Sequence, residues 1–244
     1  MKTCHDQAIE LLKKLNPSLA NAIVLAPLER QAEASILAAA FFSSEFKDQC
    51  LSELQLPRED TRSWFEPSLP HQPEIQTVEE LKSWFKQSSQ YVIQAIGVFL
   101  NPSHIPQMTT LIEEVVVAIK ITTWINQLGD KPETFSLLPT SLIEEFTLDI
   151  ENIKSSQKVP ESLARALAVL MGEARQSFVR LYHHLNQFDS SMRLAIYAGV
   201  KFYEGLLDEI IWAKFELFSS VQEVSSLRRK FMTFKAKRFL RKNK

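Results

Sequence analysis

Residues 190–218, SSMRLAIYAGVKFYEGLLDEIIWAKFELF, are the stretch that decides the fold. Apolar side chains recur along it at helical spacing, which predicts one long helix. The same periodicity is found at residues 29–54, 77–100, 106–128, 141–153 and 160–188. Only 5 glycines occur in 244 residues, so few positions suit the positive-φ turns of an all-β or Rossmann-type chain. The sequence therefore predicts an all-α protein, an antiparallel bundle of seven or eight helices around a central space.

Several helix ends carry local signals. Thr77 and Glu80 have the spacing of a capping box, which predicts the start of a helix. Gly129 is placed as a helix stop, and Pro160 suits a first helical position. Residues 50–76 contain four prolines and are predicted to be the extended loop of the chain.

The composition excludes several classes of protein. A hydrophobic content of 45% with 23% charged residues is ordinary for a folded soluble chain. Cys4 and Cys50 have neither zinc-binding nor disulfide-framework spacing, which favours a reducing compartment. The N-terminus lacks the features of a secretory or transit peptide, and the apolar runs are too short to cross a bilayer. We expect a cytoplasmic protein without a transmembrane segment, peripheral to a membrane at most.

The charge distribution separates a domain at residues 1–226 from a basic amphipathic helix at residues 227–244. That C-terminal segment contains nine Lys or Arg and no acid, which leaves 19 basic and 29 acidic residues in the domain. The predicted membrane-binding residues are Arg228, Arg229, Lys230, Lys235, Lys237, Arg238 and Arg241. Apolar residues between these cations suit an anionic membrane surface, but the segment equally suits pairing with the acidic domain. Nucleic acid is disfavoured because the acidic domain opposes a broad footprint.

Motifs in four stretches resemble the squalene/phytoene synthase family. The C-terminal part contains Ile196-Tyr197, Leu207-Asp208-x-Ile210 and Phe215-x-x-Phe218 at the family's relative spacing. Residues 24–50, 77–100 and 122–139 resemble, in the family's order, its first aspartate-rich helix, its Phe-Glu-Glu-Leu-containing helix and its second aspartate-rich motif. The resemblance implies the isoprenoid synthase fold, a helical bundle with a central apolar cavity. It also implies a structural role for Asp208 and Glu209 in packing the last helices.

The family's chemistry, by this resemblance, joins two prenyl diphosphates with the help of Mg²⁺ held by carboxylates. The first motif corresponds to Ser44-Glu45-x-x-Asp48, in which Glu45 and Asp48 share one helix face. The second corresponds to Gln127-x-x-Asp130-Lys131, in which one charge is reversed. Since Glu45, Asp48 and Asp130 are three of six acidic positions, they form a relic of a metal site. No cofactor is expected, apart from Mg²⁺ if the protein is active.

Residues for binding a substrate follow from the same resemblance. Lys131 is a candidate to hold a diphosphate, and Phe42, Trp124 and Tyr203 are candidates to line a lipid cavity. The aromatic residues suit an ordinary core equally well. Asp130 equally suits a solvated turn at a helix end.

Three functions remain open from the sequence, and whether the protein is an enzyme is not decided. The first is a catalytically degenerate protein that binds an isoprenoid or other lipid, or assists assembly with a protein partner, at a membrane surface. Some proteins that resemble the family have this kind of role. The second is an active head-to-head prenyltransferase with an altered Mg²⁺ site. The third is a structural helical interaction protein that shares only the fold.

Overall fold

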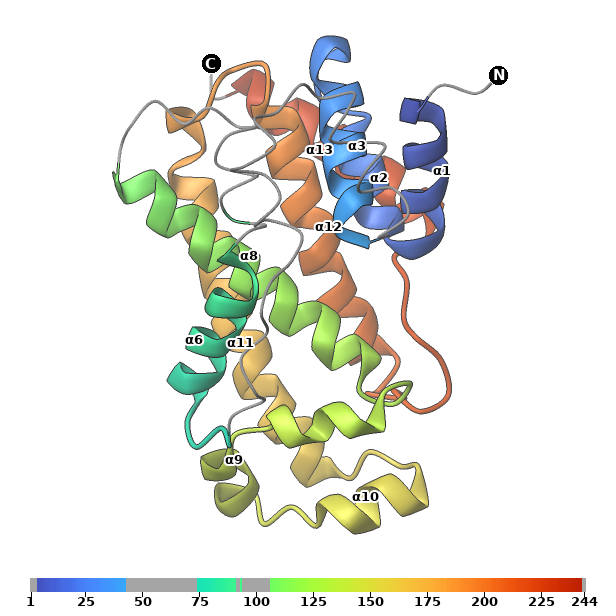
Figure 1. The fold of residues 1–244 in the computed structure, drawn as a ribbon, viewed down its shortest axis with the longest axis vertical. Helices are drawn as coiled ribbons and strands as arrows, with labels where there is room; N and C mark the ends of the chain where they lie inside the picture. Colours follow the sequence, from blue (N-terminus) through green and yellow to red (C-terminus); the bar gives the residue numbers. More distant parts are fainter. Residues whose placement is uncertain (1–3, 43–73, 91–92, 94–105, 243–244) are drawn as a thin grey trace.

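The computed structural model of the protein describes residues 4–42, 74–90, 93 and 106–242, and all regular structure in these residues is helical (Figure 1). In chain order the elements are α1 (Cys4–Leu15), α2 (Pro17–Ile23), α3 (Leu28–Phe42), α6 (Val78–Ser88), α8 (Pro106–Gln127), η1 (Pro132–Leu137), α9 (Thr140–Glu145), α10 (Ile150–Ser156), α11 (Glu161–His183), η2 (Leu185–Gln187), α12 (Arg193–Trp212) and α13 (Ser226–Lys242). The prediction of an all-α bundle is therefore confirmed.

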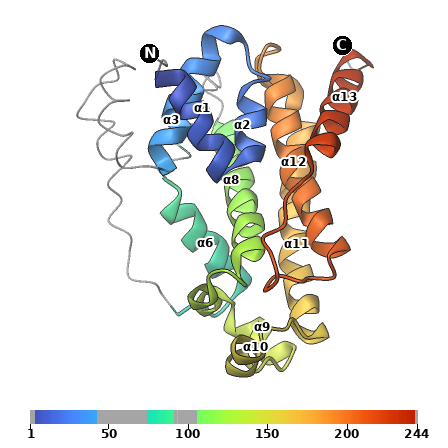
Figure 2. The ribbon, with the colours of Figure 1, turned by 90° about the vertical axis from the view of Figure 1, so that its right-hand side faces the viewer.

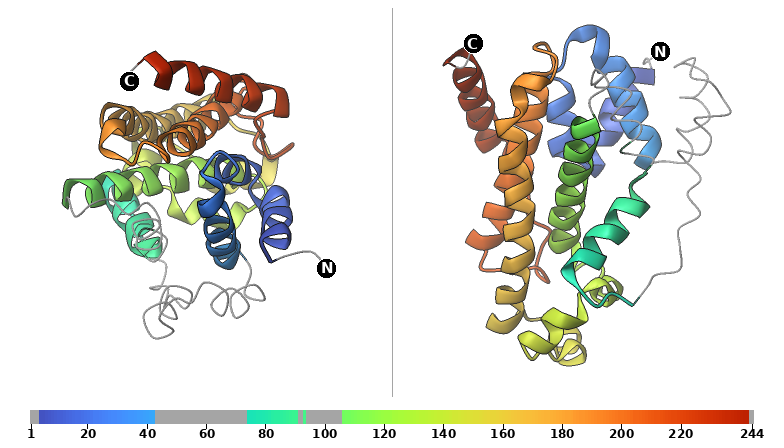
Figure 3. Two further views of the ribbon diagram at one scale, coloured as in Figure 1. Left: turned by 90° about the horizontal axis from the view of Figure 1, so that it is seen from above. Right: turned by 90° about the vertical axis from the view of Figure 1, so that its left-hand side faces the viewer.

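Three long helices, α8, α11 and α12, form the centre of the bundle. Helix α11 runs antiparallel to both of its long neighbours, and α8 packs extensively against it (Figures 1 and 3). Its buried residues, from Leu163 to Leu181, recur every three or four positions, so one stripe of α11 faces the core. Helix α12 is buried on several sides because it also contacts α2 and α13.

Shorter helices close the ends and sides of this centre. Helices α1, α2 and α3 pack together at one end of the bundle, and α9 and α10 lie at the other (Figures 1 and 2). Helix α6 lies along α8. Its capping box is confirmed: the Thr77 hydroxyl accepts from the Glu80 amide at 3.2 Å, and the Glu80 carboxylate accepts from the Thr77 amide.

The last helix, α13, packs along the outside of α12 and forms one edge of the molecule (Figures 2 and 3). Gly205 of α12 lets the Met232 side chain approach closely, and the Phe239 ring stacks on Tyr197 with centroids 4.9 Å apart. These contacts are made by the inner side of α13. Its outer side is exposed over most of its length.

Two predicted helices are interrupted where the backbone takes positive φ. The helix predicted over 190–218 ends at Trp212, and Lys214 and Phe215 follow with φ of 50° and 59°. The helix predicted over 141–153 is divided by Thr147, whose φ is 50°. Neither interruption has a glycine at its positive-φ position, where glycine usually marks such a conformation, so the interruptions were not predicted.

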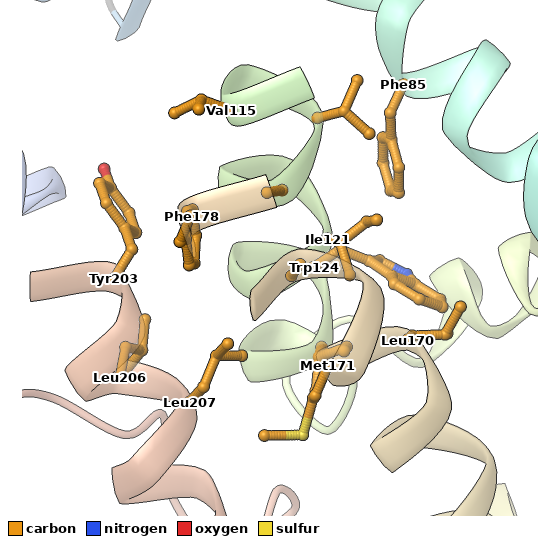
Figure 4. Close-up of a cluster of buried hydrophobic side chains, with 14 of the residues drawn as sticks. Phe85, Val115, Ile121, Trp124, Leu170, Met171, Phe178, Tyr203, Leu206 and Leu207 are labelled. Atoms are coloured by element: carbon orange, nitrogen blue, oxygen red, sulfur yellow. The ribbon is translucent and has the colours of Figure 1, made fainter. Parts of the chain in front are cut away.

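The core is a continuous cluster of apolar side chains between the three long helices. Figure 4 shows Ile121 and Trp124 of α8 beside Phe178 of α11 and Leu207 of α12, all of them buried. These side chains occupy the part of the bundle where a central space was expected, and the two pockets described below lie beside this cluster. Among the described helices, none has both the length and the apolar character needed to span a membrane.

Candidate functional site

The C-terminal end of α8 carries the residues predicted as the second aspartate-rich motif. The helix ends at Gln127, and the chain turns through residues 128–130 with hydrogen bonds from the Asp130 and Lys131 amides to the Gln127 carbonyl at 3.1 and 2.8 Å. Both side chains after the turn are exposed. The structure thus places Asp130 and Lys131 on the outer side of this turn.

The segment between α12 and α13, residues 213–225, crosses the end of α8, and we call it the strap. Asn126 holds it with two hydrogen bonds of 2.9 Å: its side-chain amide donates to the Gln222 carbonyl, and its side-chain oxygen accepts from the Gln222 amide. A Cβ atom at Gly129 would lie 2.1 Å from the Leu217 carbonyl oxygen. Gly129 does not have a positive φ, so the helix-stop prediction gave the wrong reason for this glycine, which instead allows the strap to approach closely.

A pocket of about 90 Å³ lies between the strap, the end of α8, α12 and the junction of α1 with α2. It is lined by Asn16, Pro17, Ser18, Thr123, Asn126, Gln127, Tyr203, Leu206, Val221, Gln222, Glu223, Val224 and Arg229, and we call it the α8 pocket. Tyr203 is buried, and its hydroxyl accepts a 2.8 Å hydrogen bond from the Asn16 side-chain amide. Burial raises the pKa of Tyr203 to about 12, so the hydroxyl keeps its proton at neutral pH.

The charges of the α8 pocket are balanced. Glu223 is its carboxylate, and Arg229 is its cation. Arg229 donates through Nη1 to the Val224 carbonyl, whereas its Nε is buried and has no hydrogen-bond partner among the described residues. The remaining polar groups are neutral amides and hydroxyls. The pocket therefore offers hydrogen-bond donors to a small polar ligand.

Mg²⁺, which the resemblance implies for an active relative, does not fit this set of side chains. At the position of the motif's first carboxylate the pocket has the Gln127 amide, and its lining includes one carboxylate, Glu223, together with the guanidinium of Arg229. Within the described part of the chain, no three His, Cys, Asp or Glu residues are grouped closely enough to hold a metal ion. Glu45 and Asp48 lie outside the described residues, so the first motif is not part of this comparison.

Two of the three aromatic candidates for a lipid cavity are described, and both are buried. Trp124 packs in the core, where its ring centroid lies 6.0 Å from that of Phe85 and its indole N–H donates to the Thr134 carbonyl at 3.2 Å (Figure 4). Tyr203 lies between this core and the α8 pocket. Phe42 is the last residue of α3, and its side chain is outside the described part.

The predicted membrane-binding residues fall into two groups. Arg228 bonds to the Asp208 and Glu209 carboxylates at 2.8 and 2.7 Å, and Arg229 faces the α8 pocket. These ion pairs match the structural role expected for Asp208 and Glu209. The second group, Lys230, Lys235, Lys237, Arg238 and Arg241, is exposed, and in the described part of the chain none of the five forms an ion pair. Five of the seven predicted cations are thus available to an external anion.

Sequence reasoning singled out Gln127 and Tyr203 but missed most of the other residues that build the α8 pocket, and it missed the hydrogen bonds that hold them. Asn16 and Tyr203 are 187 positions apart, and Asn126 and Gln222 are 96 positions apart. Neither pair has a local pattern that would indicate its hydrogen bond. Asn16 does carry one local signal, since it precedes Pro17 as the N-cap of α2, but that signal indicates a helix start and not a pocket.

Comparisons with known proteins agree with this architecture. The model of the family described as squalene/phytoene synthase matches residues 58–230. YisP from Bacillus subtilis subsp. subtilis strain 168 has a similar structure, with 14% sequence identity, a TM-score of 0.79 and coverage of 95% of each chain. A dehydrosqualene synthase in complex with a ligand matches with 12% identity, a TM-score of 0.77 and coverage of 98% of this chain and 97% of the other. No curated protein sequence matches the chain.

Proposed function

Because the chain belongs to the squalene/phytoene synthase family, we propose that it is a non-catalytic member that binds a lipid or protein partner at an anionic membrane surface. The observation that carries the proposal is the α8 pocket, in which Gln127 stands where the resemblance requires an aspartate. Loss of a diphosphate group from a prenyl chain needs several positive charges gathered around it, and Mg²⁺ supplies them only when carboxylates hold the ions.

The electrostatic balance of the α8 pocket supports binding over turnover. One carboxylate and one guanidinium line the pocket, so its lining has no net negative charge with which to concentrate divalent cations. Asp130, the acidic residue retained in the motif, is exposed on the turn and does not line the pocket. Lys131 beside it adds a positive charge, which opposes a metal ion at this place.

The size of the α8 pocket limits what it holds. Its volume of about 90 Å³ is well below the roughly 300–1,000 Å³ of pockets that enclose drug-sized ligands. A phosphate-sized group or a few water molecules fit this volume, whereas a prenyl chain does not. The unpartnered Nε of Arg229 and the protonated hydroxyl of Tyr203 are the groups best suited to bind such a polar ligand.

The membrane part of the proposal is supported by the exposed cations of α13. Each cation near an anionic bilayer contributes on the order of 1 kcal/mol to binding, so several together hold a soluble protein at the surface. Protein partners remain compatible with this position because binding through α13 leaves α1, α3 and α6 at a distance from the bilayer (Figure 3).

Catalysis is tested by incubating the purified protein with farnesyl or geranylgeranyl diphosphate and Mg²⁺ and measuring released pyrophosphate. We expect no release above the rate without protein. Release that Asp48→Ala abolishes would contradict the proposal and establish the alternative, a prenyltransferase that uses Glu45, Asp48 and Asp130. A rise in melting temperature with inorganic pyrophosphate, without release from the prenyl substrates, would support a pocket that binds without turnover.

Membrane binding is tested by flotation with vesicles that contain phosphatidylserine. The triple variant Lys230→Gln, Lys237→Gln, Arg241→Gln should bind about 100-fold more weakly, because three near-surface cations are removed. The matched control is Lys13→Gln, Lys14→Gln, which removes two exposed lysines from α1 and should bind like the wild type. Equal binding of all three proteins, or no binding by any, would favour the structural alternative.

A further inference from the structure

The outer side of α13 exposes a row of large apolar side chains. Leu227, Phe231, Phe234 and Arg238 recur at i, i+4, i+7 and i+11, so they lie along one stripe of the helix. Leu227, Phe231 and Phe234 are 77%, 55% and 62% exposed. Ala236, by contrast, is completely buried on the inner side. Because α13 is held by its inner side, most of the surface of these three apolar side chains is left uncovered.

Trp212, the last residue of α12, lies beside this stripe. Its side chain is 66% exposed, and the Arg228 guanidinium lies over the indole at 4.1 Å from the ring centroid. Trp212 and Phe231 line the same groove between α12 and α13, which has a volume of about 510 Å³. The Trp212 indole thus extends the apolar stripe of α13. It belongs to α12, outside the basic segment at residues 227–244 that the sequence predicted to bind membranes.

The position of Arg228 keeps Trp212 outward. The guanidinium binds Asp208 and Glu209 on α12 and also covers one face of the indole, so it links the two helices next to the exposed ring. A Trp side chain that is already held at the end of a helix loses little conformational entropy when it binds to another surface.

Cations flank the stripe on both sides. By helical spacing, Lys230, Lys237 and Arg241 follow one edge and Lys235 follows the other. A second copy of this chain would bring like charges together, and a nucleic acid would meet the acidic domain with its 29 carboxylates. Apolar side chains bordered by cations are complementary to a bilayer with anionic head groups.

We propose that Trp212, Leu227, Phe231 and Phe234 insert into the head-group region of an anionic membrane, with α13 lying in the plane of the surface. This inference rests on the membrane part of the proposed function and adds the orientation and the inserted side chains. Trp is favoured at the membrane–water interface because its ring is apolar and its N–H remains hydrated.

The experiment measures tryptophan fluorescence with vesicles of phosphatidylcholine and phosphatidylserine whose acyl chains carry bromine, a quencher. Subtracting the signal of Trp212→Phe from that of the wild type isolates Trp212, because both proteins contain the other three tryptophans, Trp64, Trp84 and Trp124. We expect the isolated signal to shift to shorter wavelength and to be quenched. Vesicles of phosphatidylcholine alone should give neither change.

A pair of variants tests the stripe directly. Phe231→Ser with Phe234→Ser should weaken vesicle binding about tenfold or more, since two rings no longer enter the apolar boundary. The matched control is Val169→Ser on α11, which removes an apolar side chain that is 42% exposed and should bind like the wild type. Circular dichroism establishes that each variant is folded.

The outcomes separate the two proposals. Binding that depends on phosphatidylserine without quenching of Trp212 overturns the inserted orientation and leaves membrane binding by α13 intact. No binding to any vesicle overturns both. If the protein binds polyglutamate and vesicles do not displace it, the proposal that α13 binds a membrane is overturned, and an acidic protein segment becomes the ligand of α13.

Discussion

The two sides of α12 use their polar groups in opposite ways. Towards α8, neutral groups are bonded within the chain: Asn126 to the strap, and Tyr203 to Asn16. Towards α13, the contacts are ion pairs of Arg228 with Asp208 and Glu209. On the first side the strap's backbone binds the end of α8, whereas the second presents outward cations that form no ion pair with the described residues.

The difference shows how the family's fold is used in this chain. On the α8 side, groups that would hold a substrate are absent or committed to the fold, as with Asn126. Neutral hydrogen bonds of this kind are insensitive to salt, whereas partly exposed ion pairs are screened. We therefore expect perturbations of the α8 side to reduce stability at any ionic strength, and perturbations of the α13 side to depend on salt.

The largest effect should follow from Gly129→Ala, which disturbs the contact between the strap and the end of α8. The added Cβ would meet the Leu217 carbonyl oxygen at 2.1 Å, so the strap or the end of α8 must move. Such overpacking costs about 3 kcal/mol of unfolding free energy. The measurement is urea denaturation followed by circular dichroism.

Gly172→Ala on α11 is the matched control, because no atom lies within 4 Å of its added Cβ. It should stabilise the protein by up to about 1 kcal/mol through helix propensity. Equal effects at the two glycines would show that the strap does not press on the end of α8.

This contrast also shows what the sequence could reveal. Periodicity was sufficient to predict the long helices, because a helix that buries one face has apolar residues at positions i, i+3 and i+4. It did not reveal the end of α12, since Lys214 and Phe215 take positive φ without glycine. The function of Gly129 was also hidden, because its contact lies 88 positions away at Leu217.

The candidate site was less predictable than the fold. That few carboxylates remain at the second motif can be read from the sequence itself, since a count of residue types is enough for it. It could not indicate that Gln222 holds Asn126 through backbone atoms, because any residue can supply those. It grouped Arg228 with the membrane-binding cations, although partners on α12 occupy its guanidinium.

The second prediction compares the hydrogen bonds made by the backbone of Gln222 in the strap with those made by its side chain. Asn126→Ala should cost about 2 kcal/mol of unfolding free energy, because the partly buried backbone amide and carbonyl of Gln222 lose their partners. Gln222→Ala keeps both backbone groups and loses only bonds to Ser220, so its cost should be about 0.5 kcal/mol or less. A larger loss for Gln222→Ala would contradict this account of the strap.

The third prediction concerns the ion pairs on the other side of α12. Arg228→Gln should cost about 1 kcal/mol at low salt, since its contacts with Asp208 and Glu209 are partly exposed. The loss should shrink in 1 M NaCl, where the Debye length is about 3 Å. Arg165→Gln is the control, because its pair with Glu161 is largely exposed and should contribute about 0.3 kcal/mol. A salt-independent loss at Arg228 would indicate packing on Trp212 in place of charge.

The fourth prediction is an effect at neutral pH as small as the third, for Tyr203→Phe, and its pH dependence tests the protonation state of the Tyr203 hydroxyl. At pH 7 the variant should lose about 1 kcal/mol, because the Asn16 amide loses its acceptor. Burial raises the pKa of Tyr203 to about 12, against roughly 10 when unfolded, so the folded state retains the proton longer. The stabilisation from this hydroxyl is therefore complete below pH 10 and is lost as the pH rises towards 12. Relative to the variant, the wild type should lose up to about 1.4 kcal/mol per pH unit in this range, as measured by urea denaturation. A constant difference between the two proteins from pH 9 to pH 11.5 would contradict this account, because it would mean that folding does not raise the pKa of Tyr203.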